Sequence, residues 1–368
     1  MGGGGVYLAS GWARAYLVAI VVASFINEAF FQRQGELILW LLTLGSMAML
    51  LVGADRAVHA AVKLAKALGI STVIIGATVV SLGTTAPEAC VSVMAAWRGN
   101  PGLALGNSVG SVICDTALIF GLCCCLTRLP LDRFVLRRHG WLQLGAGALL
   151  TAVVFVGAWV GGVDGAVIPR WVGYGFLGLL VGYLYISFRW ARQHPEMIPS
   201  EARQSANKIS AGTVAAMLGV LGLGLALVLA GSDALIGSVK ELCIRNNVPD
   251  HIVAVTLVAF GTSLPELATA LTAIIKGHPG LLVGNVIGAD ILNVLFVIGA
   301  SASASELAVP PLFLQLHLPV MMLSLLLLRG YIFASRDRFS RWQGIPLLAI
   351  YIGYLALLGS IVGATGLN

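Results

Sequence analysis

Long apolar blocks separated by short polar segments run along most of the chain. A transmembrane helix needs about 20 consecutive apolar residues to cross the hydrocarbon core of a bilayer, and ten blocks have roughly this length. The pattern therefore predicts ten membrane-spanning helices. The blocks cover residues 37–52, 73–97, 103–126, 142–160, 172–187, 209–231, 252–275, 281–300, 312–328 and 345–362.

The composition supports this prediction. Hydrophobic residues make up 58% of the 368 positions and charged residues 10%, whereas soluble globular domains average about 25% charged residues. We therefore expect an all-α, integral multi-pass protein of a bacterial or archaeal inner membrane, with the lipid bilayer as its solvent. The formal charge of +6 does not indicate a nucleic-acid partner, because the basic residues stand between the apolar blocks, where membrane topology accounts for them.

One sequence motif occurs twice in the chain. The segment GTTAPEACVSVMAAWRGNPGLALGNSVGSVICDTALIFG (residues 83–121) returns as GTSLPELATALTAIIKGHPGLLVGNVIGADILNVLFVIG (residues 261–299). The offset is 178 positions without a gap, and 14 of the 39 positions are identical. At the same offset, the GAD sequence at 53–55 corresponds to GSD at 231–233. Chance would not preserve the rare polar residues, so the chain consists of two related halves.

The repeat also predicts topology. The copies occupy the second and third blocks and the seventh and eighth blocks, so five crossings separate equivalent helices. Because five is odd, the two halves run through the membrane in opposite directions. If the segments after blocks 1, 3, 5, 7 and 9 are cytoplasmic, that side holds 16 basic residues and the other side only Arg33, Arg98, Arg170, Lys240 and Arg245, as the positive-inside rule requires. Inverted repeats of this kind place ion sites near the bilayer midplane.

The apolar pattern sets the expected domain boundaries. We expect a first five-helix repeat at 36–190, a cytoplasmic connector at 191–208 and a second five-helix repeat at 209–368. Residues 1–35 form an N-terminal extension that contains one further apolar segment. This segment is either a signal-peptide core or a retained helix. No A-x-A-like cleavage site follows it, which favours an extra N-terminal helix.

Polar side chains follow one face of each block that carries the motif. In the second block their spacing places them on one side of a helix. The seventh block repeats this face, and the third and eighth blocks add amides, a hydroxyl and a carboxyl. The four faces consist of Ser81, Thr84, Thr85, Glu88 and Ser92; Ala259, Thr262, Ser263, Glu266 and Ala270; Asn107, Ser111 and Asp115; and Asn285, Ala289 and Asn293.

Two prolines, Pro87 and Pro265, interrupt these faces. A proline inside a helix has no N–H for the carbonyl four residues earlier, which frees the carbonyls of Gly83 and Gly261. Lipid offers backbone groups no hydrogen bonds, so a bound cation could satisfy these carbonyls. All candidate ligands on the four faces are oxygens. Hard cations such as Ca²⁺ take oxygen sites, and Na⁺ fits the same chemistry, whereas Zn²⁺ and copper favour nitrogen and sulfur.

Glu88 and Glu266 are the central ionisable residues of the two motifs. Such groups at membrane depth are costly and functional by default, so we expect a cation or a proton to neutralise both. Two protonated glutamates that merely join helices would not explain the duplicated threonines and prolines. Asn107 and Asn285 fit ion binding and interhelical hydrogen bonds equally well. The repeated glycines favour close helix packing over ion contact: Gly106, Gly110, Gly284 and Gly288.

With these motifs the chain resembles the sodium/calcium exchanger family of the cation/Ca²⁺ antiporter superfamily. The signature is G-T-S-x-P-E followed by G-N-x-x-G-S-x-I, present here as GTTAPE…GNSVGSVI and GTSLPE…GNVIGADI. The resemblance implies a ten-helix antiporter that uses the inward Na⁺ gradient to expel Ca²⁺. The ions are its transported substrates, with H⁺ as a further possibility, and no resident cofactor is expected.

The resemblance also carries over the ligands of the transported ions. Both glutamates would hold Ca²⁺, helped by backbone oxygens at the two threonines, and the carbonyls of Ser81 and Ala259 would lie near Na⁺. The implied set is Glu88, Glu266, Thr84, Thr85, Thr262, Ser263, Ser111, Asp115 and Asn293, together with Ser81 and Ala259.

Three departures from the family pattern leave the driving ion open. Well-described prokaryotic relatives have Asn in the first repeat and Asp in the second, where this chain has Asp115 and Asn293. Ala289 stands where a serine hydroxyl would help one Na⁺ site. Asp290 replaces a usual Asn, and it either reaches the ion pathway or pairs with a buried donor. Sodium, protons or both could therefore drive transport.

Two other transport functions fit the same pattern of residues. A Ca²⁺/H⁺ or broader divalent-cation antiporter would use the same scaffold, and a passive cation channel would conduct without a counter-ion gradient. An enzyme is not expected, because the chain has no HExxH, no GxSxG with a partner histidine and no phosphate loop.

Overall fold

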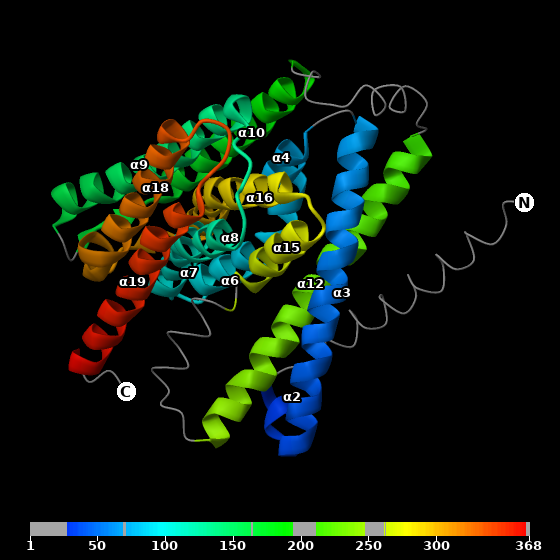
Figure 1. Ribbon diagram of the computed structural model, residues 1–368. Helices are drawn as coiled ribbons and strands as arrows, with labels where there is room; N and C mark the ends of the chain where they lie inside the picture. The colour runs from blue at the N-terminus through cyan, green and yellow to red at the C-terminus, as the bar shows by residue number, and fades with distance from the viewer. Residues whose placement is uncertain are drawn as a thin grey trace, which may run out of the picture.

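Figure 1 shows a bundle of helices with two long helices along one flank. The computed structural model describes residues 28–68, 71–162, 165–193, 211–246, 261 and 263–365. Almost all of these residues are helical. The predicted N-terminal helix, most of the predicted connector and the start of the seventh apolar block lie outside the described residues.

The first half of the chain contains α2 (Glu28–Gln32), α3 (Glu36–Leu68), α4 (Thr72–Ile75), the π-helix η1 (Gly76–Val80), α5 (Ser81–Thr84), α6 (Ala86–Trp97), α7 (Pro101–Ile113), the π-helix η2 (Cys114–Phe120), α8 (Gly121–Leu126), α9 (Arg133–Gly161), β1 (Val167–Ile168) and α10 (Arg170–Gln193). The second half contains α12 (Ala211–Arg245), α15 (Leu264–Ile275), α16 (Pro279–Leu292), the π-helix η6 (Asn293–Ile298), α17 (Gly299–Ala304), β2 (Leu307–Ala308), the π-helix η7 (Phe313–His317), α18 (Leu318–Ala334), the 3₁₀ turn η8 (Arg341–Gln343) and α19 (Gly344–Thr365). The two short strands pair antiparallel, with Val167 opposite Ala308.

The predicted membrane class is confirmed. Eight helices within the described ranges are long and apolar enough to cross a membrane, and they correspond to apolar blocks 1, 3, 4, 5, 6, 8, 9 and 10. Two shorter apolar helices, Thr72–Thr84 and Leu264–Ile275, lie in blocks 2 and 7, which carry the glutamates. The protein is therefore an all-α polytopic membrane protein. The count of ten crossings stays a prediction, because block 7 begins outside the described residues.

The sequence repeat is also a repeat of local structure. Helix α6 and helix α15 have bounds that differ by 178 at both ends, and so do α8 and α17. The π-helices η2 and η6 end at equivalent residues, Phe120 and Ile298. Equivalent sequence therefore produces equivalent helix breaks and the same uncommon i→i+5 bonding.

Helices α3 and α12 pack along each other (Figure 1). A Cβ added to Gly53 would lie 2.7 Å from the backbone nitrogen of Val228, and a Cβ added to Gly231 would lie 2.8 Å from the backbone nitrogen of Leu50. Only glycine allows the two backbones to approach this closely. Gly231 and Val228 are the equivalents of Gly53 and Leu50 at the offset of 178, so the two contacts are related as by a twofold axis.

The helices that carry the repeated motif form the interior of the bundle. In an apolar window of 18 residues, 94% of the residues are buried in the span from α16 to α17 and 78% in the span from α7 to α8, whereas the figure is 22% in the spans of α9 and α19. A Cβ on Gly284 or on Gly288 would collide with the backbone carbonyl of Val73 or of Ala77. The second glycine pair therefore serves close helix packing, as predicted. The residues equivalent to Val73 and Ala77 in the other half lie outside the described ranges.

Candidate functional site

Each repeated motif breaks its helix next to the glutamate. Helix α5 ends at Thr84 and α6 starts at Ala86, while α15 starts at Leu264. The prolines stand in the first turns of α6 and α15, where the N–H that proline lacks would be unsatisfied in any case. Glu88 and Glu266 share those first turns. The positive end of each helix dipole therefore supports the carboxylate.

The other two polar faces lie at the start of π-helical segments. Asp115 is the second residue of η2, and Asn293 is the first residue of η6. A π-helix shifts the backbone bonding by one residue and often marks a functional site. The sequence pattern did not predict these segments, because hydrophobic periodicity does not distinguish one turn of π-helix from α-helix.

The four faces converge inside the bundle. Helix α6 packs against η6, and α15 packs against η2, so each glutamate helix contacts the polar face of the other half. The carboxyl of Asp115 interacts electrostatically with those of Glu88, Glu266 and Asp290, and Glu88 interacts with Glu266. The structure therefore brings the described residues of the predicted site into one region.

Most polar groups in this region have no protein partner. The residues concerned are at most 1% exposed, although buried polar side chains are as a rule hydrogen-bonded. Within the part of the chain that the structure describes, the following atoms lack a hydrogen-bond partner: the hydroxyls of Thr85, Ser111 and Ser263, both carboxyl oxygens of Glu88, Asp115 and Glu266, and both amide atoms of Asn293.

Other predicted site residues are engaged with the protein. The hydroxyl of Ser81 donates to the carbonyl of Thr78 at 3.2 Å. The Thr84 hydroxyl contacts the Ser81 carbonyl at 3.3 Å and the Asn285 side-chain oxygen at 3.4 Å. The Ser81 carbonyl also accepts from the Thr85 N–H at 2.9 Å, so these contacts hold the chain at the helix break. Thr262 and Ala259 lie outside the described residues, so their roles stay predictions.

The two asparagines of the motif tie helices together. The Asn107 amide donates to the backbone carbonyl of Glu88 at 3.3 Å and to the Ser92 hydroxyl at 3.0 Å. The Asn285 amide donates to the Thr269 hydroxyl at 3.3 Å, while its oxygen accepts from Thr84. Of the two interpretations that the sequence left open, these contacts favour interhelical hydrogen bonds.

Asp290 pairs with buried donors beside the site. One of its carboxyl oxygens accepts hydrogen bonds from the Thr116 hydroxyl and the Gln143 amide. All three side chains are at most 3% exposed. The other oxygen of Asp290 has no partner among the described residues. Sequence reasoning missed Thr116 and Gln143, because each is a single polar residue in an apolar block.

The donor set restricts the ions that could bind. Among the residues that the structure describes, no three His, Cys, Asp or Glu side chains are arranged to hold a metal ion by themselves. Hydroxyl, amide and backbone carbonyl oxygens would have to complete the coordination. Such mixed oxygen sites suit Ca²⁺, which takes 6–8 oxygen ligands in flexible geometry.

Comparison with known sequences identifies relatives along the whole bundle. The sodium/calcium exchanger protein family model matches residues 38–189 and 216–359. An uncharacterised membrane protein of Methanocaldococcus jannaschii is 32% identical over 320 residues, which are 85% of this chain and 95% of that protein. The sodium/calcium exchanger MaX1 of Methanosarcina acetivorans is 28% identical over 346 residues, 87% of this chain and 98% of the relative.

Solved structures give the same result. The sodium-calcium exchanger NCX_Mj soaked with 100 mM Na⁺ and 10 mM Sr²⁺ matches with a TM-score of 0.74 at 27% identity, covering 88% of this chain and 99% of that chain. The form soaked with 2.5 mM Na⁺ and 0.1 mM Ca²⁺ matches with a TM-score of 0.69 at 29% identity, covering 87% and 97% of the two chains. The interrupted, glutamate-bearing helices and these matches together show that the chain belongs to the sodium/calcium exchanger protein family.

Proposed function

We propose that this chain is a secondary active antiporter that exchanges Na⁺ for Ca²⁺ at the site between α6, α15, η2 and η6. The observation that carries the proposal is the set of six carboxyl oxygens on Glu88, Glu266 and Asp115, which are all buried and none of which has a partner in hydrogen-bond geometry among the described residues. The nearest hydroxyls, Ser263 beside Asp115 and Thr84 beside Glu266, carry no charge that could neutralise them. An unpaired charge in a low-dielectric interior is very costly. A bound cation removes that cost at each of the three carboxyls.

The charge count supports exchange of these ions. Three ionised carboxyls balance three Na⁺, or one Ca²⁺ together with one proton. We assign the proton of the Ca²⁺-loaded state to Asp115. Glu88 and Glu266, each in the first turn of a helix, then neutralise the divalent ion. The hydroxyls of Thr85, Ser111 and Ser263 and the amide of Asn293 supply neutral oxygens around it.

Alternating access would come from movement of α3 and α12 against the rest of the bundle. These two helices pack on each other, and a rigid unit that rocks or slides past a fixed midplane site is how inverted-repeat transporters operate. Disulfides engineered between this pair and the bundle should stop exchange, and full turnover in the locked protein would contradict the assignment.

A Ca²⁺/H⁺ antiporter is the second candidate. Asp290 supplies a fourth buried carboxyl next to the other three, which gives the site an additional proton acceptor. One experiment separates the two functions. Purified protein in liposomes is supplied with Ca²⁺ under an imposed Na⁺ gradient at equal pH, and then under a pH gradient without Na⁺. Uptake that needs the Na⁺ gradient supports Na⁺/Ca²⁺ exchange, uptake driven by the pH gradient alone supports the second candidate, and uptake without either gradient indicates a channel.

A further inference from the structure

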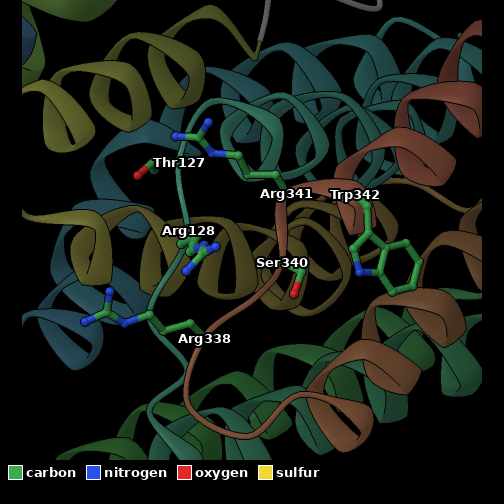
Figure 2. A pocket seen from close by; sticks show the side chains of 6 residues that line it. All are labelled: Thr127, Arg128, Arg338, Ser340, Arg341 and Trp342. Carbon is green, nitrogen blue, oxygen red and sulfur yellow. The ribbon is translucent and has the colours of Figure 1, made fainter.

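A depression of about 700 Å³ opens at the end of the bundle that the charge pattern assigns to the cytoplasm. It lies between two segments, 127–132 from the first half and 335–343 from the second half (Figure 2). Three of its six lining residues are arginines, and none is acidic. The lining residues are Thr127, Arg128, Arg338, Ser340, Arg341 and Trp342.

The backbone of the two segments is firmly held together. The Leu131 N–H donates to the Asp337 carbonyl and the Phe339 N–H donates to the Leu129 carbonyl, both at 2.8 Å. Phe339 is fully buried and packs edge-on against Phe120, with ring centroids 5.1 Å apart. The arginines therefore project from a fixed frame.

Among the described residues, no ion pair neutralises the three arginines of the depression, although Asp132 and Asp337 stand in the same two segments. None of Arg128, Arg338 and Arg341 forms an ion pair or a side-chain hydrogen bond with another residue in the described ranges. Nearby arginines differ. Arg133 donates to the carbonyl of Arg336 at 2.7 Å, and the guanidinium of Arg329 lies 4.1 Å from the ring centroid of Trp141. The three guanidinium groups are spaced along the 127–132 segment, with that of Arg128 between those of Arg341 and Arg338 (Figure 2).

The exposed residues beside the depression indicate that it lies at the height of the lipid headgroups. Leu126 is 51% exposed and Ile345 is 63% exposed, and they are the last and second residues of α8 and α19. Exposed apolar side chains on these helices face hydrocarbon, so the arginines next to them in the chain lie at its boundary. Trp342 is 60% exposed, as is typical of the aromatic belt at this depth.

We propose that this depression binds the phosphate headgroup of an anionic phospholipid from the cytoplasmic leaflet. Arginine's planar fork matches phosphate oxygens with paired hydrogen bonds, and the hydroxyls of Thr127 and Ser340 add neutral donors. The adjoining apolar ends of α8 and α19 give the acyl chains a surface. A free soluble phosphate would gain nothing from that surface.

The position of the site gives the lipid a structural effect. One wall belongs to the first half of the chain and the other to the second half, and α19 packs against both η2 and α8. Because η2 carries Asp115, a headgroup bridging the two walls would fasten together the ends of helices that build the ion site. Bound lipid should therefore stabilise the folded protein.

The test measures the thermal unfolding midpoint of the full chain in neutral detergent during titration with dioctanoyl phosphatidylglycerol. Dioctanoyl phosphatidylcholine and inorganic phosphate are titrated in parallel. We expect a saturable rise of the midpoint with phosphatidylglycerol only. In the Arg128→Gln/Arg338→Gln/Arg341→Gln variant, the half-saturating concentration should rise about fivefold for each arginine lost, since one basic residue contributes about 1 kcal/mol at an anionic surface.

The matched control is Arg56→Gln/Lys63→Gln/Lys66→Gln, which removes equal charge from exposed residues of α3 on the same predicted side. It should bind as tightly as the unmodified protein. Equal weakening in the control would mean diffuse surface charge, and equal stabilisation by inorganic phosphate would mean a soluble-anion site. Either result overturns the proposal, as does the absence of any preference for phosphatidylglycerol.

If the triple variant does not fold, single substitutions of Arg338 can be measured in the same lipid titration. Arg338→Gln should weaken binding about fivefold, and Arg338→Lys should weaken it less, because lysine keeps the charge but loses the forked geometry. Unchanged binding in both variants would contradict the proposal.

Discussion

The two halves of the protein share their local structure but differ in their chemistry beside the ion site. Asp290 of the second half forms a buried polar network with Thr116 and Gln143 of the first half. At the offset of 178, the equivalent positions hold Val112, Val294 and Met321, all at most 1% exposed. The alignment of the two halves with an offset of 178 also holds near residue 143, because His139 and His317 stand at this offset.

A second difference is an ion pair that joins the α3–α12 pair to the rest of the bundle at one end of the pair. Asp55 on α3 forms an ion pair of 2.8 Å with Lys276, just after α15. The equivalent residues are Asp233 on α12 and Arg98, just after α6, and within the described ranges these two form no ion pair. The Asp55–Lys276 ion pair can therefore act as a latch that links α3 to the end of α15, and among the described residues no equivalent ion pair links α12 to the end of α6.

These differences separate two tasks. The glutamates and the helix breaks are present in both halves, as a site on a pseudo-twofold axis requires. The asymmetric residues lie around that site and at the ends of the α3–α12 pair, where they can bias the transported ion or the orientation without altering the central ligands. Substitutions that make the two halves more alike or more different test this separation.

The largest effect should follow from removing either glutamate. Glu88→Gln and Glu266→Gln should each reduce Ca²⁺ uptake by proteoliposomes to the level of protein-free liposomes, because each removes a carboxylate that neutralises a dehydrated divalent ion. The proteins should remain folded, since neither carboxyl has a hydrogen-bond partner within the described part of the chain. Asn107→Ala is the control and should chiefly loosen packing. Near-normal uptake by either glutamine variant would disprove the site.

Exchanging the asymmetric acid tests whether the halves are equivalent at the site. Asp115→Asn combined with Asn293→Asp conserves the charge and the ligand count, so it should retain clearly more Ca²⁺ uptake than Asn293→Asp alone, which adds a further acid to the site. Asp115→Asn alone should keep Ca²⁺ binding and change its dependence on pH. If the exchanged protein is as inactive as a Glu88 variant, positions 115 and 293 are not equivalent.

The Asp290 network can be replaced by the apolar residues that stand at the equivalent positions, 178 residues away in the chain. Asp290→Leu should lower the free energy of unfolding by about 1–3 kcal/mol, because the Thr116 and Gln143 donors lose their acceptor. Thr116→Val/Gln143→Met/Asp290→Val copies the three apolar residues at the equivalent positions and should recover most of this stability. Thermal unfolding in detergent measures both. If the triple variant is less stable than Asp290→Leu, apolar packing cannot replace the hydrogen-bonded network, and this prediction is wrong.

The glycine contacts between α3 and α12 should respond symmetrically. Gly53→Ala and Gly231→Ala each place a methyl group against the backbone of the other helix, and overpacking of this kind costs about 1–3 kcal/mol. The two losses should be similar. In contrast, Gly45 on α3 has nothing within 4 Å of an added Cβ, so Gly45→Ala should leave stability unchanged or raise it slightly. Unequal losses at the two glycines would argue against a twofold relation.

The smallest effect should come from the ion pair. Lys276 and Asp55 are 29% and 47% exposed, and exposed pairs contribute about 0–1 kcal/mol. Lys276→Gln should shift the balance between the two orientations of α3 and α12 by no more than about fivefold. The shift can be measured as opposite changes in apparent Ca²⁺ affinity at the two membrane faces. Arg98→Gln, which breaks no pair here, should not cause the same shift; an identical response would show that the pair is not a latch.

Only part of the site could be predicted from the sequence, and the residues concerned show why. Glu88, Glu266 and the helix breaks beside them were predictable, because a charge or a proline inside an apolar block is costly without a function. Thr116 and Gln143 were not, since a lone polar residue in a helix has no distinctive pattern. The predicted roles of Thr262 and Ala259 remain predictions.

The sequence by itself determined that the protein lies in a membrane, which segments are helical, and that the chain contains two related halves. Apolar block length fixes what can cross a bilayer, and a constant offset of 178 fixes which residues are equivalent. Only the tertiary structure decided which equivalents differ in role. Asp290 became a hydrogen-bonded residue because α9 and η2 bring donors to it from 147 and 174 residues away in the chain. Likewise, only the meeting of segments 127–132 and 335–343 gathered three arginines at one depression. Contacts between residues this far apart are set by helix packing, which no local pattern encodes.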